Sequence, residues 1–185
     1  GLFEPSSGMV TMDDTDIRQI DPAELRHFIG YVPQDIMLFR GTVRENVTMG
    51  ANDVDDSSIM RAAELASVDE FIKRHPLGFD MEVGEFGRGL SGGQRQCVVM
   101  ARAMLLDPPV VVLDEPTSNM DSRTELRIKH NLTGATKGKT IVLITHRASL
   151  LEMVDRIIVI DNGKIVADGP KASVLEALQR GQLNI

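Results

Sequence analysis

The chain has 185 residues, of which 42% are hydrophobic and 25% are charged, a composition that predicts a globular domain with a core of its own. Its net charge of -7 argues against duplex nucleic acid as a partner, because neutralising phosphates requires a basic surface. The aliphatic runs at residues 110–113 and 157–160 are too short to span a bilayer, and the single cysteine, Cys97, excludes an internal disulfide.

The first 50 residues predict short elements separated by turns. Residues 9–16 follow a Ser-Ser-Gly turn and predict a short strand. Asp21 followed by Pro22 is typical of a helix start, with Asp as the cap and Pro at the first position. Residues 28–32 predict a strand that Pro33 ends, and the polar Gln34 lies just beyond it.

A more helical region follows. Residues 57–65 and 68–72 predict two short helices, and residues 77–89 are rich in glycine and acidic residues. The strongest helix prediction covers residues 91–106. There Cys97, Val98, Ala101, Met104 and Leu105 form an apolar stripe at helical spacing.

The last third of the chain alternates strands and helices. Strands are predicted at residues 110–113 and 140–145, and helices at residues 122–132, 149–154 and 171–178. Asp161-Asn162-Gly163 predicts the turn of a hairpin. Since the apolar runs are continuous, we expect parallel strands covered by helices on both faces. The predicted fold class is α/β, with a mostly parallel sheet, a small helical subdomain and a C-terminal hairpin.

The stretch Leu90-Ser91-Gly92-Gly93-Gln94 joins a helix start to two glycines. Ser91 and Gln94 match a capping box, which places both glycines in the first helical turn. Each glycine weakens a helix by about 1 kcal/mol relative to alanine, and a merely structural helix start would gain nothing from two of them. Unpaired N–H groups at the positive helix end favour an anion, so the pattern indicates a phosphate site. An ordinary cap in a glycine-rich connection is the alternative.

Two other segments resemble nucleotide motifs less well. Residues 87–92 fit G-x-G-x-x-G, the dinucleotide-binding fingerprint, but residues 79–86 carry three acids and make a poor strand before it. Residues 133–140 end in Gly-Lys-Thr, yet Thr133 stands where a phosphate loop needs its first glycine, and we read them as a helix-to-strand turn. The pattern G-x-x-x-x-G-K-[ST] occurs nowhere in the sequence. A dinucleotide-binding oxidoreductase domain remains an alternative.

The predicted strand at residues 110–113 delivers two acids to the carboxyl edge of the sheet, where ligands of open α/β folds bind. Asp114 can hold Mg²⁺, and Glu115 can act as a general base towards a water. His146 ends the next apolar strand at the same edge and could donate to a γ-phosphate. The amide oxygen of Gln34 could reach Mg²⁺ or its water. Taken singly, each of these residues is also compatible with an ordinary solvated strand end.

In order, Gln34, LSGGQ at 90–94, VVVLDEP at 110–116, Ser118–Asp121 and Thr145-His146 resemble the nucleotide-binding domain of an ABC transporter. The resemblance covers essentially the whole chain and implies that these are the Q-loop, signature motif, Walker B, D-loop and switch histidine. It implies a partial domain in three parts: core 1–50, helical subdomain 51–106 and core 107–185. The implied cofactors are ATP and Mg²⁺. The implied site residues are Glu115, His146 and Gln34 in catalysis, Ser91, Gly92, Gly93, Gln94 and Asp121 at the nucleotide, and Asp114 with Gln34 at the metal.

Three segments resemble those of the exporter subgroup. Residues 39–47 look like the exporter pattern after the Q-loop, and residues 82–87 look like the loop that contacts the coupling helices of a transmembrane domain. Residues 161–170 are similar to the tail of bacterial type I secretion exporters. That likeness implies a periplasmic adaptor, an outer-membrane channel and a place on the cytoplasmic face of the inner membrane.

The family's Walker A loop lies just upstream of a segment like Gly1–Gly8, so the chain looks like a domain cut immediately after it. In this family two domains pair head to tail, and each signature helix closes on the ATP that its partner holds. The resemblance therefore implies a second nucleotide-binding domain as partner, and no ATPase activity of the chain alone. A non-catalytic dimerisation or docking module is the alternative. The short spacing from Gln34 to Ser91 disfavours a DNA-repair ATPase with long coiled coils.

Overall fold

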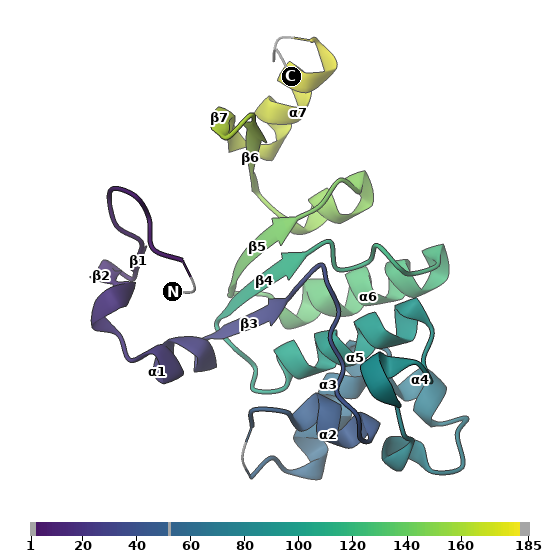
Figure 1. Ribbon diagram of the computed structural model, residues 1–185. Helices are drawn as coiled ribbons and strands as arrows, with labels where there is room; N and C mark the ends of the chain where they lie inside the picture. Colours follow the sequence, from purple (N-terminus) through teal and green to yellow (C-terminus); the bar gives the residue numbers. More distant parts are fainter. Residues whose placement is uncertain (1–2, 52, 182–185) are drawn as a thin grey trace. The chain divides into compact units, whose positions relative to one another are not determined.

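The computed structural model describes residues 3–51 and 53–181 and divides the chain into two compact units, residues 1–144 and 145–185 (Figure 1). The first unit holds a three-stranded parallel sheet, a two-stranded ribbon and most of the helices. The second holds a hairpin and a helix. None of the helices in these residues has the length and hydropathy needed to cross a membrane.

The parallel sheet consists of β3 (Ile29–Val32), β4 (Val110–Asp114) and β5 (Thr140–Ile144), in the order β3-β4-β5. Val32 pairs with Leu113, and Asp114 pairs with Ile144. Because the strands are parallel and in this register, their carboxyl ends meet at one edge of the sheet. This edge is where the sequence places its acidic strand end.

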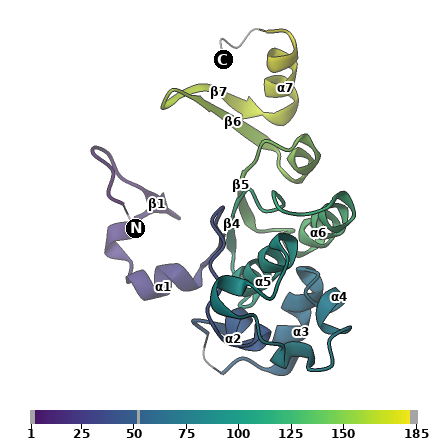
Figure 2. The same ribbon diagram turned by 45° about the vertical axis from the view of Figure 1, so that its right-hand side comes forward.

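Two long helices lie on the same face of the sheet (Figures 1 and 2). They are α5 (Gly92–Met104) and α6 (Ser122–Ala135), and both were predicted. Beneath them Val111 and Leu113 of β4 are fully buried. The alternation of buried and half-buried residues along β4 shows that the core lies on this face.

A close contact joins β3 to the end of α5. A methyl group at Gly30 would lie 2.4 Å from the carbonyl oxygen of Ala103, so only glycine allows this approach. The strand and the helix are thereby held at a fixed distance on the covered face of the sheet.

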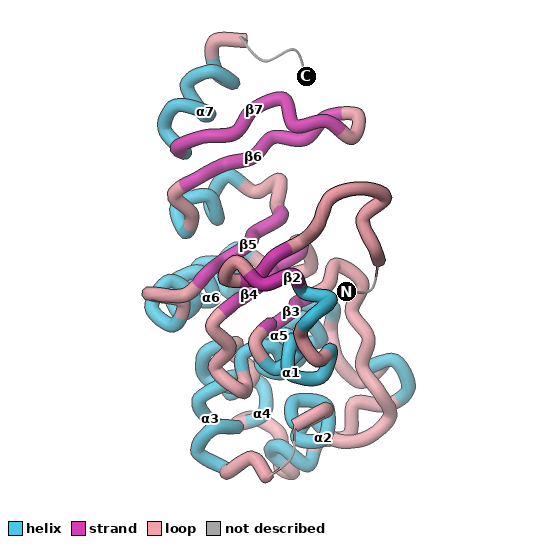
Figure 3. Tube along the Cα trace, turned by 90° about the vertical axis from the view of Figure 1, so that its left-hand side faces the viewer, coloured by secondary structure: helices cyan, strands magenta, loops and turns pink. Residues whose placement is uncertain are grey.

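The opposite face of the sheet is more open. Tyr31, Val142 and Ile144 are 50%, 46% and 49% exposed, although the sequence predicts strands buried on both faces. Among the described residues, α1 (Pro22–His27) packs beside β3, and no helix covers the exposed side chains of β5. Together with Ile29 and Tyr31, residues of α1 and the segment 16–20 line a largely apolar groove of about 540 Å³. Figure 3 shows α1 and the neighbouring two-stranded ribbon from the side on which they lie.

The ribbon consists of β1 (Thr11–Met12) and β2 (Thr15–Asp16), followed by a 3₁₀ turn, η1 (Ile17–Gln19). The prediction of one strand over residues 9–16 was therefore wrong. Asp13 and Asp14 between the strands have φ of 46° and 63°, which Asp tolerates better than most residues, and they reverse the chain. The predicted cap of α1 is confirmed, since Asp21 accepts hydrogen bonds from the N–H groups of Ala23 and Glu24.

The helical region contains α2 (Val43–Thr48), α3 (Asp56–Leu65) and α4 (Asp69–Ile72). Both α2 and α3 pack on α5. The sequence analysis missed α2, although Thr42 and Glu45 form the capping box that marks its start. The two longer predicted helices, α3 and α5, are present within two residues of their predicted ends.

The glycine-rich stretch before α5 is built from two 3₁₀ turns, η2 (Gly78–Asp80) and η3 (Glu85–Gly87). Its one strand-like contact is an isolated bridge between Thr42 and Glu82. The strand that a dinucleotide fingerprint requires before Gly87 is therefore not formed.

The second unit contains η4 (Ala148–Met153), β6 (Arg156–Asp161), β7 (Lys164–Pro170) and α7 (Lys171–Gln179). The predicted hairpin turn is confirmed, because Asn162 and Gly163 both have positive φ, as a type I′ turn requires. The helix predicted at residues 149–154 is a 3₁₀ helix instead. Across the hairpin Arg156 makes two hydrogen bonds of 2.6 Å to Asp168.

Candidate functional site

Asp114 and Glu115 stand at the carboxyl end of β4, where the sequence places them. The N–H of Glu115 donates to the carbonyl oxygen of Ile144 at 2.9 Å and extends the ladder with β5. Glu115 has a φ of 46°, in the left-handed region, where a residue other than glycine pays about 1 to 3 kcal/mol. Its carboxylate oxygen Oε2 is buried. A strained, partly buried carboxylate at the ligand-binding edge of a parallel sheet is typical of a catalytic group.

Gln34 reaches the same edge of the sheet. It lies two residues beyond Val32, the last residue of β3, and is exposed. A carboxylate from Asp114 and an amide oxygen from Gln34 suit Mg²⁺, which takes few protein ligands and keeps water or phosphate oxygens in its shell. Within residues 3–51 and 53–181, no group of three or more His, Cys, Asp or Glu could hold a metal. A metal contact of Asp114 and Gln34 stays a prediction.

His146 belongs to the second unit, two residues along the chain from the end of β5. It is exposed and lies in the bend before η4. In this bend the hydroxyl of Thr145 accepts a hydrogen bond of 3.0 Å from the N–H of Arg147. The role of His146 at a γ-phosphate stays a prediction.

The start of α5 has the geometry of a capping box. The N–H of Gln94 donates to Ser91 Oγ at 3.2 Å, and the N–H of Ser91 donates to Gln94 Oε1 at 2.9 Å. No acceptor for the N–H groups of Gly92 and Gly93 occurs in the part of the chain that the structure describes. Those two donors, at the positive end of a helix of 13 residues, can bind an anion.

The two glycines also have a structural reason. A methyl group at Gly92 would lie 3.3 Å from Asn119 Cβ, and one at Gly93 would lie 3.1 Å from the carbonyl oxygen of Asn119. The turn formed by residues 117–120 therefore packs directly on the first turn of α5. The argument that a structural helix start gains nothing from two glycines was wrong, because the close partner is distant in the sequence.

Asp121 caps α6. Its carboxylate accepts hydrogen bonds from the N–H groups of Arg123 and Thr124, both at 3.0 Å, and from the hydroxyl of Thr124 at 2.7 Å. The bonds from Thr124, and then from Arg123, lower the pKa of Asp121. The family resemblance implies that Asp121 contacts the nucleotide, whereas in the structure its carboxylate caps α6. A nucleotide contact of Asp121 stays a prediction.

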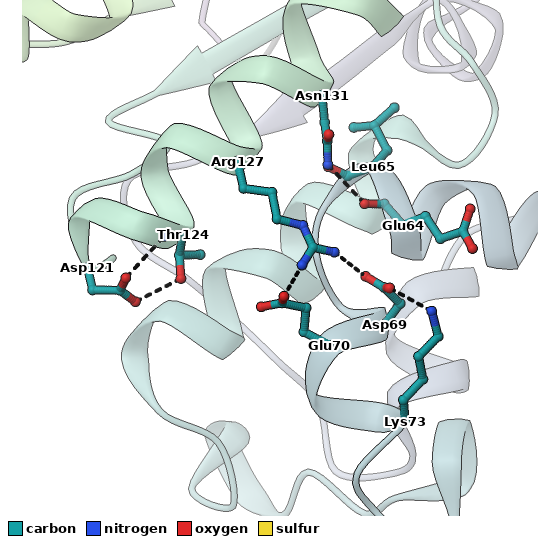
Figure 4. Close-up of polar contacts among 9 residues, drawn as sticks. All are labelled: Glu64, Leu65, Asp69, Glu70, Lys73, Asp121, Thr124, Arg127 and Asn131. Atoms are coloured by element: carbon teal, nitrogen blue, oxygen red, sulfur yellow. Dashed lines mark hydrogen bonds and ion pairs between the residues drawn. The ribbon is translucent and has the colours of Figure 1, made fainter.

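Side chains of α6 tie this helix to α3 and α4 (Figure 4). Arg127 forms an ion pair of 3.0 Å with Asp69 and a second, short one with Glu70. Asp69 is only 6% exposed and also binds Lys73 at 2.9 Å. Sequence reasoning missed this cluster, because charges on two segments far apart in the sequence carry no local signal of their pairing.

One turn further along α6, Asn131 Nδ2 donates to the carbonyl oxygens of Glu64 and Leu65, both at 3.1 Å (Figure 4). These carbonyls belong to the last turn of α3, where no further helical turn follows to supply N–H donors, and that of Glu64 also accepts from the N–H of Ser67 at 3.2 Å. The helical region is thus fastened to the helix that follows the acidic strand end.

The two segments that resemble exporter loops lie together. The N–H of Val43 donates to the carbonyl oxygen of Met81, and that of Val83 donates to Gly41, both at 2.9 Å. Phe86 has a φ of 53° and is 68% exposed, which is unusual for a large apolar side chain in a strained backbone. Phe39 on the other segment is 47% exposed, and Met37, two residues before that segment, is 57% exposed. These loops present apolar side chains to the solvent.

The sequence profile of the ABC transporter family matches residues 1–118. The chain belongs to the ABC transporter family. It is 42% identical over 175 residues to the transport/processing ATP-binding protein ComA of Streptococcus pneumoniae, covering 94% of this chain and 24% of ComA. It is 44% identical over 167 residues to the beta-(1-->2)glucan export ATP-binding/permease protein NdvA of Rhodopseudomonas palustris, covering 90% of this chain and 28% of NdvA.

Among solved structures, a bacterial Atm1-family ABC exporter with ATP bound superposes with a TM-score of 0.88 at 35% identity, covering 94% of this chain and 30% of that chain. This similarity confirms the α/β fold class and the resemblance to ABC exporters. The ABC transporter chain described here spans 24% to 30% of the length of these relatives. The roles of its individual site residues stay predictions.

Proposed function

We propose that this chain is part of the ATP-hydrolysing nucleotide-binding domain of an ABC exporter. The observation that carries the proposal is the edge of the parallel sheet, where the register brings Asp114, the strained Glu115 and the segment of Gln34 together. Family membership supports ATP as the ligand. Phosphoryl transfer depends mainly on positioning and charge stabilisation, and this edge offers the residues for both.

Each residue has a distinct task in the proposed reaction. Glu115 accepts the proton of the attacking water and orients it, and its fixed backbone limits how far the carboxylate can move. Asp114 and Gln34 hold Mg²⁺, which neutralises phosphate charge when it is bound. His146 donates a hydrogen bond to the γ-phosphate. Ser91, Gly92, Gly93 and Gln94 present the start of α5 to a nucleotide, and Asp121 also contacts the nucleotide in this proposal.

The signature turn acts on ATP held by a second domain in this proposal. Its glycine N–H groups are available, yet the sequence contains no phosphate loop of the G-x-x-x-x-G-K-[ST] pattern. In a head-to-tail pair the phosphate loop belongs to the partner domain. The first turn of α5 then closes on the nucleotide that is bound at the phosphate loop of the partner. We expect the 185 residues alone to hydrolyse no ATP above background.

The partner that converts hydrolysis into transport is a transmembrane domain. We propose that it docks on the two loops with Met37, Phe39 and Phe86, because apolar side chains exposed on neighbouring loops favour a protein interface. We further propose that the chain works on the cytoplasmic face of a bacterial inner membrane. The resemblance of residues 161–170 supports type I secretion, with a periplasmic adaptor and an outer-membrane channel as further partners.

The test is Glu115→Gln in the complete exporter that carries this sequence. General bases contribute about 10²- to 10⁴-fold, so we expect ATP turnover to fall at least about 100-fold. Glu64→Gln, an exposed glutamate of α3, serves as the matched control and is expected to keep turnover. Turnover of Glu115→Gln close to that of the wild type would remove Glu115 from the mechanism.

A second candidate function is a non-catalytic module that pairs or docks. The missing phosphate-loop pattern favours it for the chain by itself. The two candidates separate when a phosphate-loop domain of an exporter is added to the chain. ATP-dependent association without hydrolysis supports the docking module. ATP hydrolysis that is lost in the Glu115→Gln variant supports the ATP-hydrolysing domain.

A further inference from the structure

Gln96 is a buried amide on α5, one turn after the two glycines. Its side chain is 0% exposed, and its Nε2 has no hydrogen-bond partner within the described residues. Asn119 Nδ2 donates to Gln96 Oε1 at 3.4 Å, at the long end for a hydrogen bond. A buried donor without an acceptor lowers stability, and a methionine of similar volume would avoid this. Packing alone therefore does not account for a glutamine at this position.

Asn119 contacts α5 in two ways. Its side chain meets Gln96, and its Cβ and carbonyl oxygen close over Gly92 and Gly93 at the distances given above. One residue therefore touches both the backbone of the first turn and the buried amide of the second turn. Because Asn119 is itself exposed, replacing it with alanine removes the amide contact with Gln96 without opening the core, and it keeps the Cβ and the carbonyl oxygen that lie over the glycines.

The turn that carries Asn119 is held from both sides. The N–H of Ser118 donates to the carbonyl oxygen of Glu115 at 3.2 Å, and that of Met120 donates to Thr117 at 3.1 Å. On the other side Asp121 caps α6, which Arg127 fastens to α4. Asn119 therefore lies in a turn whose backbone is held at both ends, beginning at the strained Glu115.

We propose that Asn119 and Gln96 form an amide pair that positions the first turn of α5, so that Ser91 and the two glycine N–H groups face a nucleotide phosphate. Asn119 is a positioning residue in this scheme, since it acts through α5 and not on the substrate. The inference rests on the proposed function of that turn. It adds that the turn depends on a contact with residues 117–120, which the capping box does not supply.

The test is a double-mutant cycle on ATP turnover in the complete exporter, with Asn119→Ala, Gln96→Met and the double variant. An amide hydrogen bond contributes about three- to tenfold to an equilibrium, so each single variant is expected to lower kcat by about that factor. The KM for ATP stays within about twofold, because we expect the phosphate loop of the partner to bind most of the nucleotide. The double variant is expected to lose no more than the worse single variant.

Two controls separate positioning from folding. Asn131→Ala, the same change on α6 where it meets α3, is expected to lower stability and leave kcat per folded molecule unchanged. Asn119→Ala alone decides the matter if Gln96→Met does not fold. Unchanged kcat per folded molecule in Asn119→Ala, or losses that multiply in the double variant, would overturn the proposal. A parallel Glu115→Gln arm shows whether the proposed function itself holds: an inactive Glu115→Gln beside a fully active Asn119→Ala refutes the amide pair alone.

Discussion

Replacing Arg127 with alanine tests whether α6 is fastened to the helical region by charge. The guanidinium binds Asp69 at 3.0 Å and Glu70 by a second, short contact (Figure 4). Asp69 is 6% exposed, so its carboxylate has little water to replace a lost partner. Removing one member of a buried ion pair costs about 3 to 5 kcal/mol, whereas exposed pairs contribute about 1 kcal/mol or less.

The expected free-energy cost of removing the Arg127 side chain lies between these two limits. Asp69 keeps Lys73 at 2.9 Å after the substitution, and the side chain of Arg127 is 34% exposed. The contact with Glu70 is worth little, because the Glu70 side chain is 42% exposed. We therefore expect Arg127→Ala to lower the free energy of unfolding by about 2 kcal/mol. Arg127→Lys, which keeps the charge but loses the two-pronged geometry, is expected to lose about half of that.

The assay is urea denaturation of the 185-residue chain, followed by far-UV circular dichroism and by the fluorescence of Tyr31. Tyr31 is the only tyrosine, the chain has no tryptophan, and Tyr31 lies on β3, so its emission reports the first unit. Arg123→Ala is the matched control, since Arg123 is an exposed arginine one turn earlier on α6 and is expected to change stability by less than about 0.5 kcal/mol. If Arg127→Ala and Arg123→Ala have the same stability, α6 is held by packing and the charge argument is wrong.

Three further outcomes follow from single contacts. Gly134→Ala, in α6 with open space around it, is expected to stabilise the chain by about 0.5 to 1 kcal/mol, whereas Gly93→Ala gains nothing because its methyl group meets Asn119; urea denaturation compares them. Burial raises the pKa of Cys97 to about 12, so a disulfide exchange reagent at pH 8 reacts with it only after unfolding; fast reaction of the native chain would contradict this. Hydrogen bonds lower the pKa of Asp121 in the folded state, so its stabilisation is present above the pKa of the unfolded chain and is lost as the pH falls through the folded value. Between pH 5 and 3 the melting temperature of Asp121→Asn is therefore expected to fall less than that of the wild type.

Elements whose signals are local could be predicted from the sequence. The cap of α1 by Asp21, the hairpin turn at Asn162-Gly163 and the capping box of Ser91 and Gln94 each depend on residues a few positions apart. The same kind of signal at Thr42 and Glu45 marks the start of α2, so this helix was also predictable from local residues, although the sequence analysis did not predict it. The ribbon was misread because two aspartates, and no glycine, make its turn.

The parts of the candidate site that were not predicted depend on contacts between distant segments. The placement of Asp114 and Glu115 was confirmed, because an apolar run followed by acids is a local pattern. The left-handed backbone of Glu115 gave no signal, since glutamate rarely adopts it. Neither did the pairing of Arg127 with Asp69, nor that of Asn119 with Gln96, whose partners are separated by dozens of residues.

The glycine pair at residues 92 and 93 shows why one pattern can carry two causes. The close approach of Asn119 favours small residues there, and an anion would favour the same residues with their N–H groups available. The two causes act on different atoms, since packing constrains Cα and its hydrogens while the anion uses the amides. A methyl group at Gly92 or Gly93 disturbs the packing against Asn119. The capping box of Ser91 and Gln94 does not use the N–H groups of the two glycines, so these stay available to an anion. Ser91→Asp keeps an oxygen that can cap α5 and leaves the glycine contacts in place, but it adds a negative charge beside the glycine amides. Loss of nucleotide-dependent activity in Ser91→Asp, with the fold preserved, would therefore identify the anion as an independent cause.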